Sequence, residues 1–291
     1  MDNYVTYHLH SSYSLLDSTT SYKDYIDYAA QIGQTAICFT EHGNIYNWVK
    51  KKIYCEERGL KYLHGVECYL TRNHEEKVRD NYHIILIAKN YEGVKEINTL
   101  VSKSTNAMQL ITSDTVNHFF YKPRISFDEF LGISKNVIKI SACLASPLNK
   151  LSPTDPIYNK LIKAYDYLEI QPHNCIEQVV YNRHLLQLGQ KYGIPLIAGT
   201  DTHSLNEYKA ECRTILQQAK GIEFDTEDEF DLTYKTLDEL VAMFAEQNAI
   251  PEEDYLQAID NTNIMADSVE EFELDISFKY PKLYGDAESD K

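Results

Sequence analysis

Short apolar runs alternate with amphipathic segments along the first two thirds of the chain. The apolar runs, bounded by turn residues, predict seven strands at about 4–7, 35–40, 62–69, 82–88, 137–142, 168–171 and 194–200. The amphipathic segments predict helices at about 22–32, 44–58, 93–103, 155–166 and 175–192, with a short one near Phe127. Residues 105–125 fit neither pattern. Strands that alternate with helices imply a parallel sheet, either open or closed into a barrel.

The pattern changes near residue 222. The acidic stretch from Glu223 to Asp231 predicts a solvated loop, and Thr236 to Glu239 has the spacing of a capping box at the start of a helix. A second helix is expected over about 254–266, and the polar tail after residue 275 resembles a linker. We therefore expect two regions, a domain over 1–221 that carries the chemistry and a helical extension with a linker over 222–291.

The charge balance restricts the kinds of partner. The 291 residues include 28 basic and 44 acidic side chains, a net charge of −16, which argues against general binding to nucleic acid or a membrane surface. A local site where metal ions supply positive charge remains compatible with this balance. No apolar run approaches the roughly 20 residues of a membrane span, and no secretory signal is recognisable. The six cysteines lack C-x-x-C spacing, so we expect reduced thiols and a cytoplasmic protein.

The stretch from residue 8 to residue 17 is the first candidate for chemistry. His8 and His10 follow the first predicted strand two residues apart, so their side chains point to the same side. Asp17 could return to them through the intervening loop. Imidazole and carboxylate together suit zinc, manganese or iron. The alternative is a solvated pair of histidines that arose by chance.

Further metal-competent side chains stand at or just beyond the ends of predicted strands. They are His42, Glu67, Cys143, Asp201 and His203. Side chains at the carboxyl ends of parallel strands converge on one crevice or barrel mouth. Each also has a structural interpretation, since a histidine or an aspartate can cap a helix and a cysteine can be a small buried hydrophobe. Their common position at strand ends favours a single metal site.

Several motifs extend this set across nearly the whole chain. They are H-L-H-S-S-Y-S-L-L-D at 8–17, T-E-H-G-N at 40–44, G-V-E-C-Y at 65–69, Y-H-I-I-L-I-A-K-N at 82–90, K-P-R-I at 122–125, S-A-C-L at 141–144, D-T-H at 201–203, K-T-L-D-E-L at 235–240 and D-N-T-N-I at 260–264. The set resembles the PHP (polymerase and histidinol phosphatase) domain family, in the version found in the alpha subunits of bacterial replicative DNA polymerase III. Its last two motifs resemble the stretch that connects this domain to the polymerase core. The sequence ends at Lys291, before any polymerase core, so we expect no nucleotide polymerisation from this chain.

The resemblance implies an α/β fold, a distorted (βα)7 TIM-like barrel with a short C-terminal helical extension. It also implies two or three divalent ions (zinc, manganese or iron, with magnesium an alternative) held by nine ligands. By resemblance, the first ion takes His8, His10, Glu67 and Asp201; the second takes His83 and Cys143, with Glu67 bridging; the third takes Asp17, His42 and His203. Glu67, Asp201 and His10 are the expected catalytic residues.

One of these ligands conflicts with the strand pattern. His83 stands at the start of its predicted strand, whereas the other ligands follow strand ends, so His64 or His74 could take its place. Three further histidines, His118, His173 and His184, are expected at the surface or at helix caps. His173 is the most interesting of them because it follows the sixth predicted strand.

The resemblance implies a metal-dependent phosphoesterase, most specifically the 3′→5′ exonuclease or proofreading module of a replicative polymerase. Its expected partners are single-stranded DNA 3′ ends or nucleotide phosphates, and a polymerase core or another replisome protein, with no membrane. Arg124 and Lys122 are candidates for phosphate contact, or else surface residues. Two alternatives stay open: a free-standing small-molecule phosphatase of the histidinol-phosphate type, and a non-catalytic metal-binding scaffold that supports a polymerase.

Overall fold

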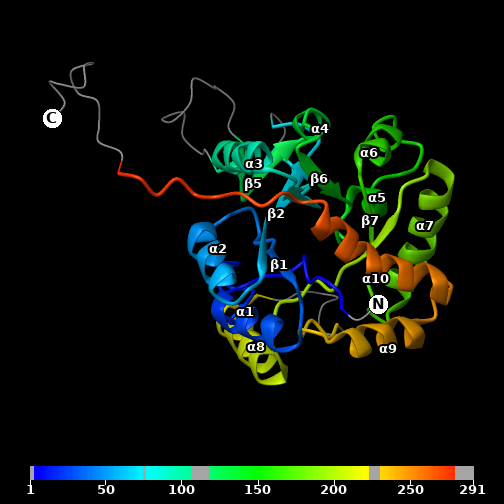
Figure 1. Cartoon of the computed structure of the whole chain (residues 1–291). Helices are drawn as coiled ribbons and strands as arrows, with labels where there is room; N and C mark the ends of the chain where they lie inside the picture. The colour runs from blue at the N-terminus through cyan, green and yellow to red at the C-terminus, as the bar shows by residue number, and fades with distance from the viewer. Residues whose placement is uncertain (1–2, 75–76, 106–117, 223–229, 279–291) are drawn as a thin grey trace, which may run out of the picture.

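Two groups of paired strands lie at the centre of the fold (Figure 1). The computed structural model describes residues 3–74, 77–105, 118–222 and 230–278. The larger sheet has the order β4-β5-β2-β3-β6, with β1 paired to β2, and the smaller sheet pairs β7 with β8. The strands are β1 Ala36–Phe39, β2 Lys61–Thr71, β3 Tyr82–Ala88, β4 Phe119–Phe120, β5 Lys122–Ser126, β6 Val137–Ile140, β7 Leu168–Ile170 and β8 Leu196–Ala198.

Helices connect and cover these strands, which makes the fold a mixed α/β one (Figure 1). They are α1 Tyr22–Gln31, α2 Trp48–Glu57, α3 Tyr91–Ser104, α4 Phe127–Leu131, α5 Pro147–Lys150, α6 Tyr158–Ala164, α7 Ile176–Tyr192, α8 Glu207–Lys220, α9 Leu237–Gln247 and α10 Glu252–Asp267. Most agree with the amphipathic pattern. The capping box predicted at Thr236 is confirmed, because its side chain and that of Glu239 bond reciprocally to the backbone at the start of α9.

The strand directions correct the prediction of an all-parallel sheet. β1 and β5 run parallel to β2, and β7 runs parallel to β8, but β3 is antiparallel to both β2 and β6. The reason lies in the connection between β2 and β3. Parallel neighbours need a crossover of a dozen or more residues, usually a helix, whereas residues 72–81 form a shorter connection in which the described part carries no helix or strand.

The chain before β1 pairs with the sheets through single bridges. Thr6 bridges to Ile37, and Leu9 bridges to Thr202. Elsewhere, a single bridge from Ile140 to Tyr167 joins β6 to the residue before β7. The strand predicted over 4–7 is therefore wrong as a regular strand, although the Thr6 bridge places it beside β1. Among the described residues the pairing consists of two sheets and these bridges, and not of one continuously hydrogen-bonded barrel.

The last helix packs into the same core as the first residues of the chain. Met265 and Ala266 of α10 are buried against Val5 and Ile197. Polar contacts fix the helix there: the Thr262 hydroxyl accepts a hydrogen bond from the Val5 amide at 2.9 Å. The division of the chain into two regions at residue 221 stays a proposal. Helix α10 belongs to the second region but packs into the core of the first.

Helix α8 was not predicted. The side chains that it buries are polar, Arg213 and Gln217, whereas Tyr208 and Ile215 on its apolar side are exposed. The acidic loop predicted over 223–231 falls mostly outside the described residues, as does the end of the polar tail. None of the described helices is long and apolar enough to cross a membrane.

Candidate metal centre

The antiparallel direction of β3 brings His83 to the same edge as the other candidate ligands. In the β2–β3 pair, His83 lies opposite Tyr69, and Glu67 lies opposite Ile85. Glu67 and His83 are thus diagonal neighbours on one face of the sheet, close enough for long side chains to meet. His64 lies elsewhere, bonded to Asn98, and His74 lies against Glu129. The structure therefore places His83, and not His64 or His74, beside the centre.

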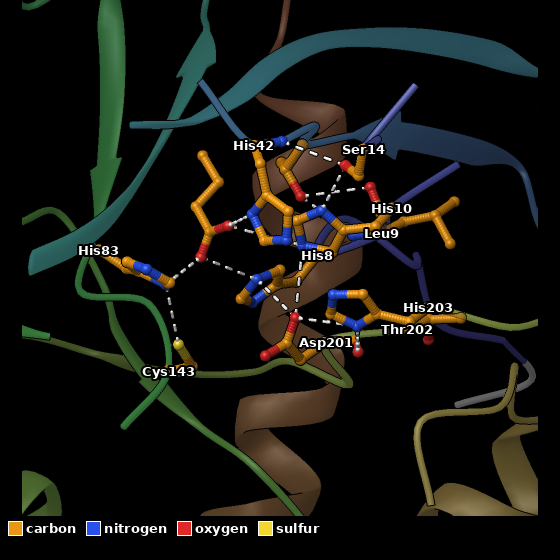
Figure 2. Close-up of polar contacts among 12 residues, drawn as sticks. His8, Leu9, His10, Ser14, His42, His83, Cys143, Asp201, Thr202 and His203 are labelled. Atoms are coloured by element: carbon orange, nitrogen blue, oxygen red, sulfur yellow. Dashed lines mark hydrogen bonds and ion pairs between the residues drawn. The ribbon is translucent and has the colours of Figure 1, made fainter. Parts of the chain in front are cut away.

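Glu67 stands in the middle of the cluster. Its Oε1 lies 2.8 Å from Nδ1 of His83, and its Oε2 lies 2.5 Å from Nδ1 of His42. The Nε2 atoms of His8 and His10 are 3.6 and 3.7 Å from the same carboxylate. The same Nδ1 of His83 lies 3.5 Å from the Cys143 sulfur (Figure 2). This carboxylate is consequently positioned to be shared between two neighbouring ions.

Asp201 gathers a second group of imidazoles (Figure 2). Its Oδ1 lies 3.0 Å from Nε2 of His8 and 3.3 Å from Nε2 of His10, and 3.6 Å from Nδ1 of His203. The residue follows β8 with a φ of 47°, a left-handed conformation that aspartate tolerates better than most residues. This turn directs the carboxylate back toward the histidines of the N-terminal segment.

Asp17 completes a third group. Its Oδ2 lies 2.8 Å from Nε2 of His42 and 3.2 Å from Nε2 of His203. The other oxygen, Oδ1, accepts hydrogen bonds from Arg213 at 2.5 Å and from Gln217 at 3.1 Å. The polar face of α8 therefore orients Asp17 and leaves one of its oxygens for the imidazoles. All nine residues that the sequence indicated are brought together in these three groups.

The unsatisfied atoms of the cluster fit the chemistry of bound metal. Nε2 of His8, His10 and His203 and Oδ1 of Asp201 are buried, and none has a hydrogen-bond partner of good geometry among the described residues. Buried polar atoms without partners are costly, and they are rare in folded proteins. Imidazole nitrogens and carboxylate oxygens that converge in this way, with a cysteine sulfur at one edge, are the donor set of zinc, manganese or iron.

The local electrostatics divide these donors into two groups. Although burial opposes it, neighbouring carboxylates raise the pKa values of His8, His42 and His203, so these imidazoles must lose a proton to bind a metal. Burial and the charges of neighbouring His42 and His203 lower the pKa of His10 to about 3, so its imidazole is neutral near pH 7. Burial disfavours the Glu67 carboxylate, but His83 and His42 outweigh it and hold its pKa well below the usual range. The same balance, with His8 and His203 as the neighbours, lowers the pKa of Asp201. Burial raises the pKa of the Cys143 thiol, which therefore needs a cation to ionise.

Two supporting contacts were missed by the sequence reasoning. The buried Glu169 of β7 lies 2.7 Å from Nδ1 of His8. Nδ1 of His10 lies 3.0 Å from the Ser14 hydroxyl, which donates to the buried Glu41 at 2.7 Å. Second partners of this kind orient metal-binding imidazoles and set their tautomers. A charged residue inside a short apolar strand, as at Glu169, was the signal available in the sequence.

A cavity of about 190 Å³ opens onto the cluster. Its wall includes His83, Cys143 and Asp201, and on the outer side Lys150 and Glu177, which pair at 3.1 Å. A cavity of this size can take a phosphate group with part of its ester, and it opens to solvent.

The two basic residues proposed for phosphate contact differ in their surroundings. Arg124 is buried, donates to the Val78 carbonyl at 3.1 Å and is therefore engaged in the fold. Lys122 donates to the Tyr69 hydroxyl at 3.3 Å, and the Tyr69 ring lies beside His83, with a centroid distance of 5.1 Å. Lys122 is thus the better placed of the two, and Lys150 is a further cation that the sequence did not indicate.

The surface positions expected for the remaining histidines are wrong in two cases. His118 and His173 are both buried. His173 stacks on Phe230, with ring centroids 4.7 Å apart, and burial lowers its pKa to about 4. His184 is partly buried within α7 and lies 2.7 Å from the Tyr158 hydroxyl. None of the three belongs to the nine-residue cluster.

A family model described as the PHP domain matches residues 6–173, more than half of the chain. The chain belongs to the PHP domain family. The matched region of this PHP domain contains seven of the nine clustered residues, and Asp201 and His203 follow it along the chain.

Curated relatives resemble the chain over most of its length. DNA polymerase III subunit alpha of Borreliella burgdorferi is 27% identical in an alignment 304 residues long, gaps included. The alignment covers 96% of this chain and 24% of that protein. The protein of the same name from Aquifex aeolicus is 30% identical over 234 residues, covering 74% of this chain and 19% of that protein. The chain therefore spans about a quarter, or less, of the length of these relatives.

A solved structure supports the fold. A protein from Bifidobacterium adolescentis, described as a metal-dependent phosphoesterase, aligns with a TM-score of 0.50 at 14% identity, over 69% of this chain and 87% of that one. At this level of identity the likeness concerns the fold alone. It agrees with the mixed α/β architecture of the PHP domain described above.

Proposed function

We propose that this PHP domain is a metal-dependent phosphoesterase that acts on single-stranded DNA 3′ ends as a 3′→5′ exonuclease. The observation that carries the proposal is the convergence of nine donor side chains, four with buried unsatisfied atoms, beside a cavity of phosphate-ester size. The distorted (βα)7 barrel expected for the family remains part of the proposal. The single bridges Leu9–Thr202 and Ile140–Tyr167 join segments whose pairing would close such a barrel.

The proposed ligand sets follow the three groups in the structure. His8, His10, Asp201 and Glu67 would hold one ion; Glu67, His83 and Cys143 a second; Asp17, His42 and His203 a third. Divalent ions in such sites lower the pKa of water and offset the charge on phosphate oxygens during an in-line displacement. Zinc, manganese and iron suit these donors better than magnesium, which prefers oxygen ligands.

The residues of the chain have separate tasks in this proposal. Glu67 and Asp201 supply the negative charge that retains the ions, and His10 stays neutral and able to coordinate. Lys150 lines the cavity and Lys122 lies against Tyr69 beside His83, and both would attract the phosphate of an arriving strand. No side-chain nucleophile is needed, since water is the attacking group.

The size and charge of the site favour a strand end over a duplex. A cavity of about 190 Å³ would admit one terminal ester, and a net charge of −16 provides little basic surface for a long backbone. We therefore expect weak, salt-sensitive binding of single strands and resistance of duplex DNA. The names of the relatives support a polymerase core as the partner. The proposal also includes another replisome protein as a partner and a location in the cytoplasm.

The small cavity also favours one alternative, a phosphatase for small phosphomonoesters. The test is a 5′-labelled and a 3′-labelled single-stranded oligonucleotide, assayed with manganese or zinc, beside release of inorganic phosphate from small monoesters. A ladder that shortens from the 3′ end, and that Asp201→Asn abolishes, is the expected result. Phosphate release with intact oligonucleotides would instead identify the phosphatase. Inactivity in both assays with metal bound would identify a scaffold.

A further inference from the structure

A second group of metal-competent side chains lies apart from the nine-residue cluster. It consists of His74, in the connection after β2, His118, directly before β4, and Glu129, in the first turn of α4. From this group we infer a further metal site, which binds one zinc ion and fastens these three segments together. The inference does not depend on the proposed phosphoesterase function, because it uses none of the nine residues.

The distances suit ligands of one ion. Nε2 of His74 lies 2.8 Å from Oε2 of Glu129, and Nδ1 of His118 lies 3.7 Å from Oε1 of the same carboxylate. One ligand atom from each residue lies within 4.8 Å of the other two. Tetrahedral zinc with bonds of about 2.0 Å holds its ligand atoms about 3.3 Å apart. The two observed nitrogen–oxygen distances, 2.8 and 3.7 Å, lie on either side of that value.

The rings are arranged as neighbouring ligands and not as a stacked pair. The His74 and His118 centroids are 4.1 Å apart with an interplanar angle of 42°. Their side chains are 8% and 4% exposed, whereas that of Glu129 is 27% exposed. Two imidazoles and one carboxylate leave the fourth position of zinc for a water molecule, and the open side at Glu129 provides room for one.

Glu129 is held ready as an anionic ligand. Its Oε2 accepts a hydrogen bond from the Ser126 amide at 2.7 Å, as the second half of the capping box of α4. Burial raises the pKa of this carboxyl, but the hydrogen bonds from His74 and Ser126 outweigh burial and lower the pKa to about 2. The carboxylate is therefore ionised at neutral pH and fixed in place by the helix start.

An ion at this point would support the approach to the main centre. β4 pairs antiparallel with β5, Phe119 opposite Pro123, and β5 pairs with β2 beside Tyr69. The β4–β5 hairpin carries Lys122, whose ammonium lies 5.1 Å from the centroid of the Tyr69 ring. Fixing His118 to α4 and to the β2–β3 connection would therefore fix the hairpin that presents Lys122.

The experiment must separate this ion from those of the main centre. In the full 291-residue chain, Glu67→Ala, Asp201→Asn and His42→Ala are combined to dismantle the main centre, and zinc per chain is measured by elemental analysis after zinc loading and desalting. We expect about one zinc ion to remain and to be lost when His74→Gln and His118→Gln are added. His184→Gln is the matched control and should retain the ion.

A second measurement covers the case in which the combined variant does not fold. In the otherwise unchanged chain, His118→Gln should lower the zinc content by about one ion per chain while circular dichroism stays that of the parent. Cobalt in place of zinc should lose part of its visible absorption in the same variant. If His74→Gln and His118→Gln leave zinc content and cobalt absorption unchanged, the three residues form only an ion pair and the inference is wrong.

Discussion

Oε1 of Glu169 lies 2.7 Å from Nδ1 of His8, with both side chains fully buried. The Glu169 oxygen is placed to accept a hydrogen bond from Nδ1 of His8, which leaves Nε2 of His8 facing Glu67 and Asp201. The Tyr7 hydroxyl and the Gln171 amide also donate to Glu169. One acidic side chain therefore determines which nitrogen of His8 is available to a metal.

The first prediction concerns this contact. In Glu169→Gln the oxygen can still accept from His8, but the negative charge that favours the metal-bound imidazole is lost. We expect metal affinity at the His8 group to weaken by about tenfold, the low end for such supporting contacts. Competition with a chromogenic chelator measures this, with Glu92→Gln, an exposed residue of α3, as the control. Equal affinities in the parent and Glu169→Gln would contradict the role of Glu169.

The second prediction concerns the close approach of Gly199 to the same carboxylate. A Cβ at Gly199 would lie 2.4 Å from Cδ of Glu169, whose oxygens are tied by several hydrogen bonds. Gly199→Ala should therefore cost about 1–3 kcal/mol of stability and weaken metal binding as Glu169→Gln does. Gly132→Ala, where the nearest atom is 3.4 Å away, is the matched control for chemical denaturation. A stable Gly199→Ala chain with parental metal affinity would be unexpected.

The third prediction concerns Glu67, which touches imidazoles of all three groups. Glu67→Ala should reduce hydrolysis to background and lower the metal content by more than one ion, since the residue is shared. The fold should survive, because the apolar cores are built from other residues. An activity assay, elemental analysis and circular dichroism measure hydrolysis, metal content and the fold, respectively. Parental activity in Glu67→Ala would rule out the proposed ligand arrangement.

The fourth prediction concerns pH and lies outside the metal centre. His64 is buried against Asn98, and burial lowers its pKa from 6.5 to about 4. The unfolded chain therefore takes up a proton at higher pH than the folded chain, so stability falls as the pH drops from 6.5 toward 4. The loss from this residue is about 3 kcal/mol at most.

The measurement for His64 is urea unfolding of metal-free protein at a series of pH values. His64→Gln should be less stable than the parent above pH 7 but should lose less stability on acidification. The two curves should therefore approach each other between pH 6.5 and 4. Parallel curves over this range would show that His64 does not titrate as described.

Much of the candidate metal centre could be predicted from the sequence because its residues interrupt apolar strands at their ends. His42 and Asp201 stand out in this way, and parallel strands bring such positions together. His83 could not be placed from the residue pattern alone, because the alternation of side chains along a strand does not reveal the direction of the strand. The short connection between β2 and β3 does reveal it. Glu169 was missed because a buried strand interior suggests packing, and Arg213 because its helix buries a polar face.

The position of α10 has a practical consequence for anyone who divides this chain into fragments. The boundary of the family match, residue 173, would remove Asp201 and His203, and a cut at residue 221 would expose Val5 and Ile197 by taking away the helix that covers them. A truncation series should therefore keep residues through at least Val269, which is buried in the same cluster. Shorter fragments are expected to aggregate or unfold, and inactivity in them would not report on the proposed catalytic residues.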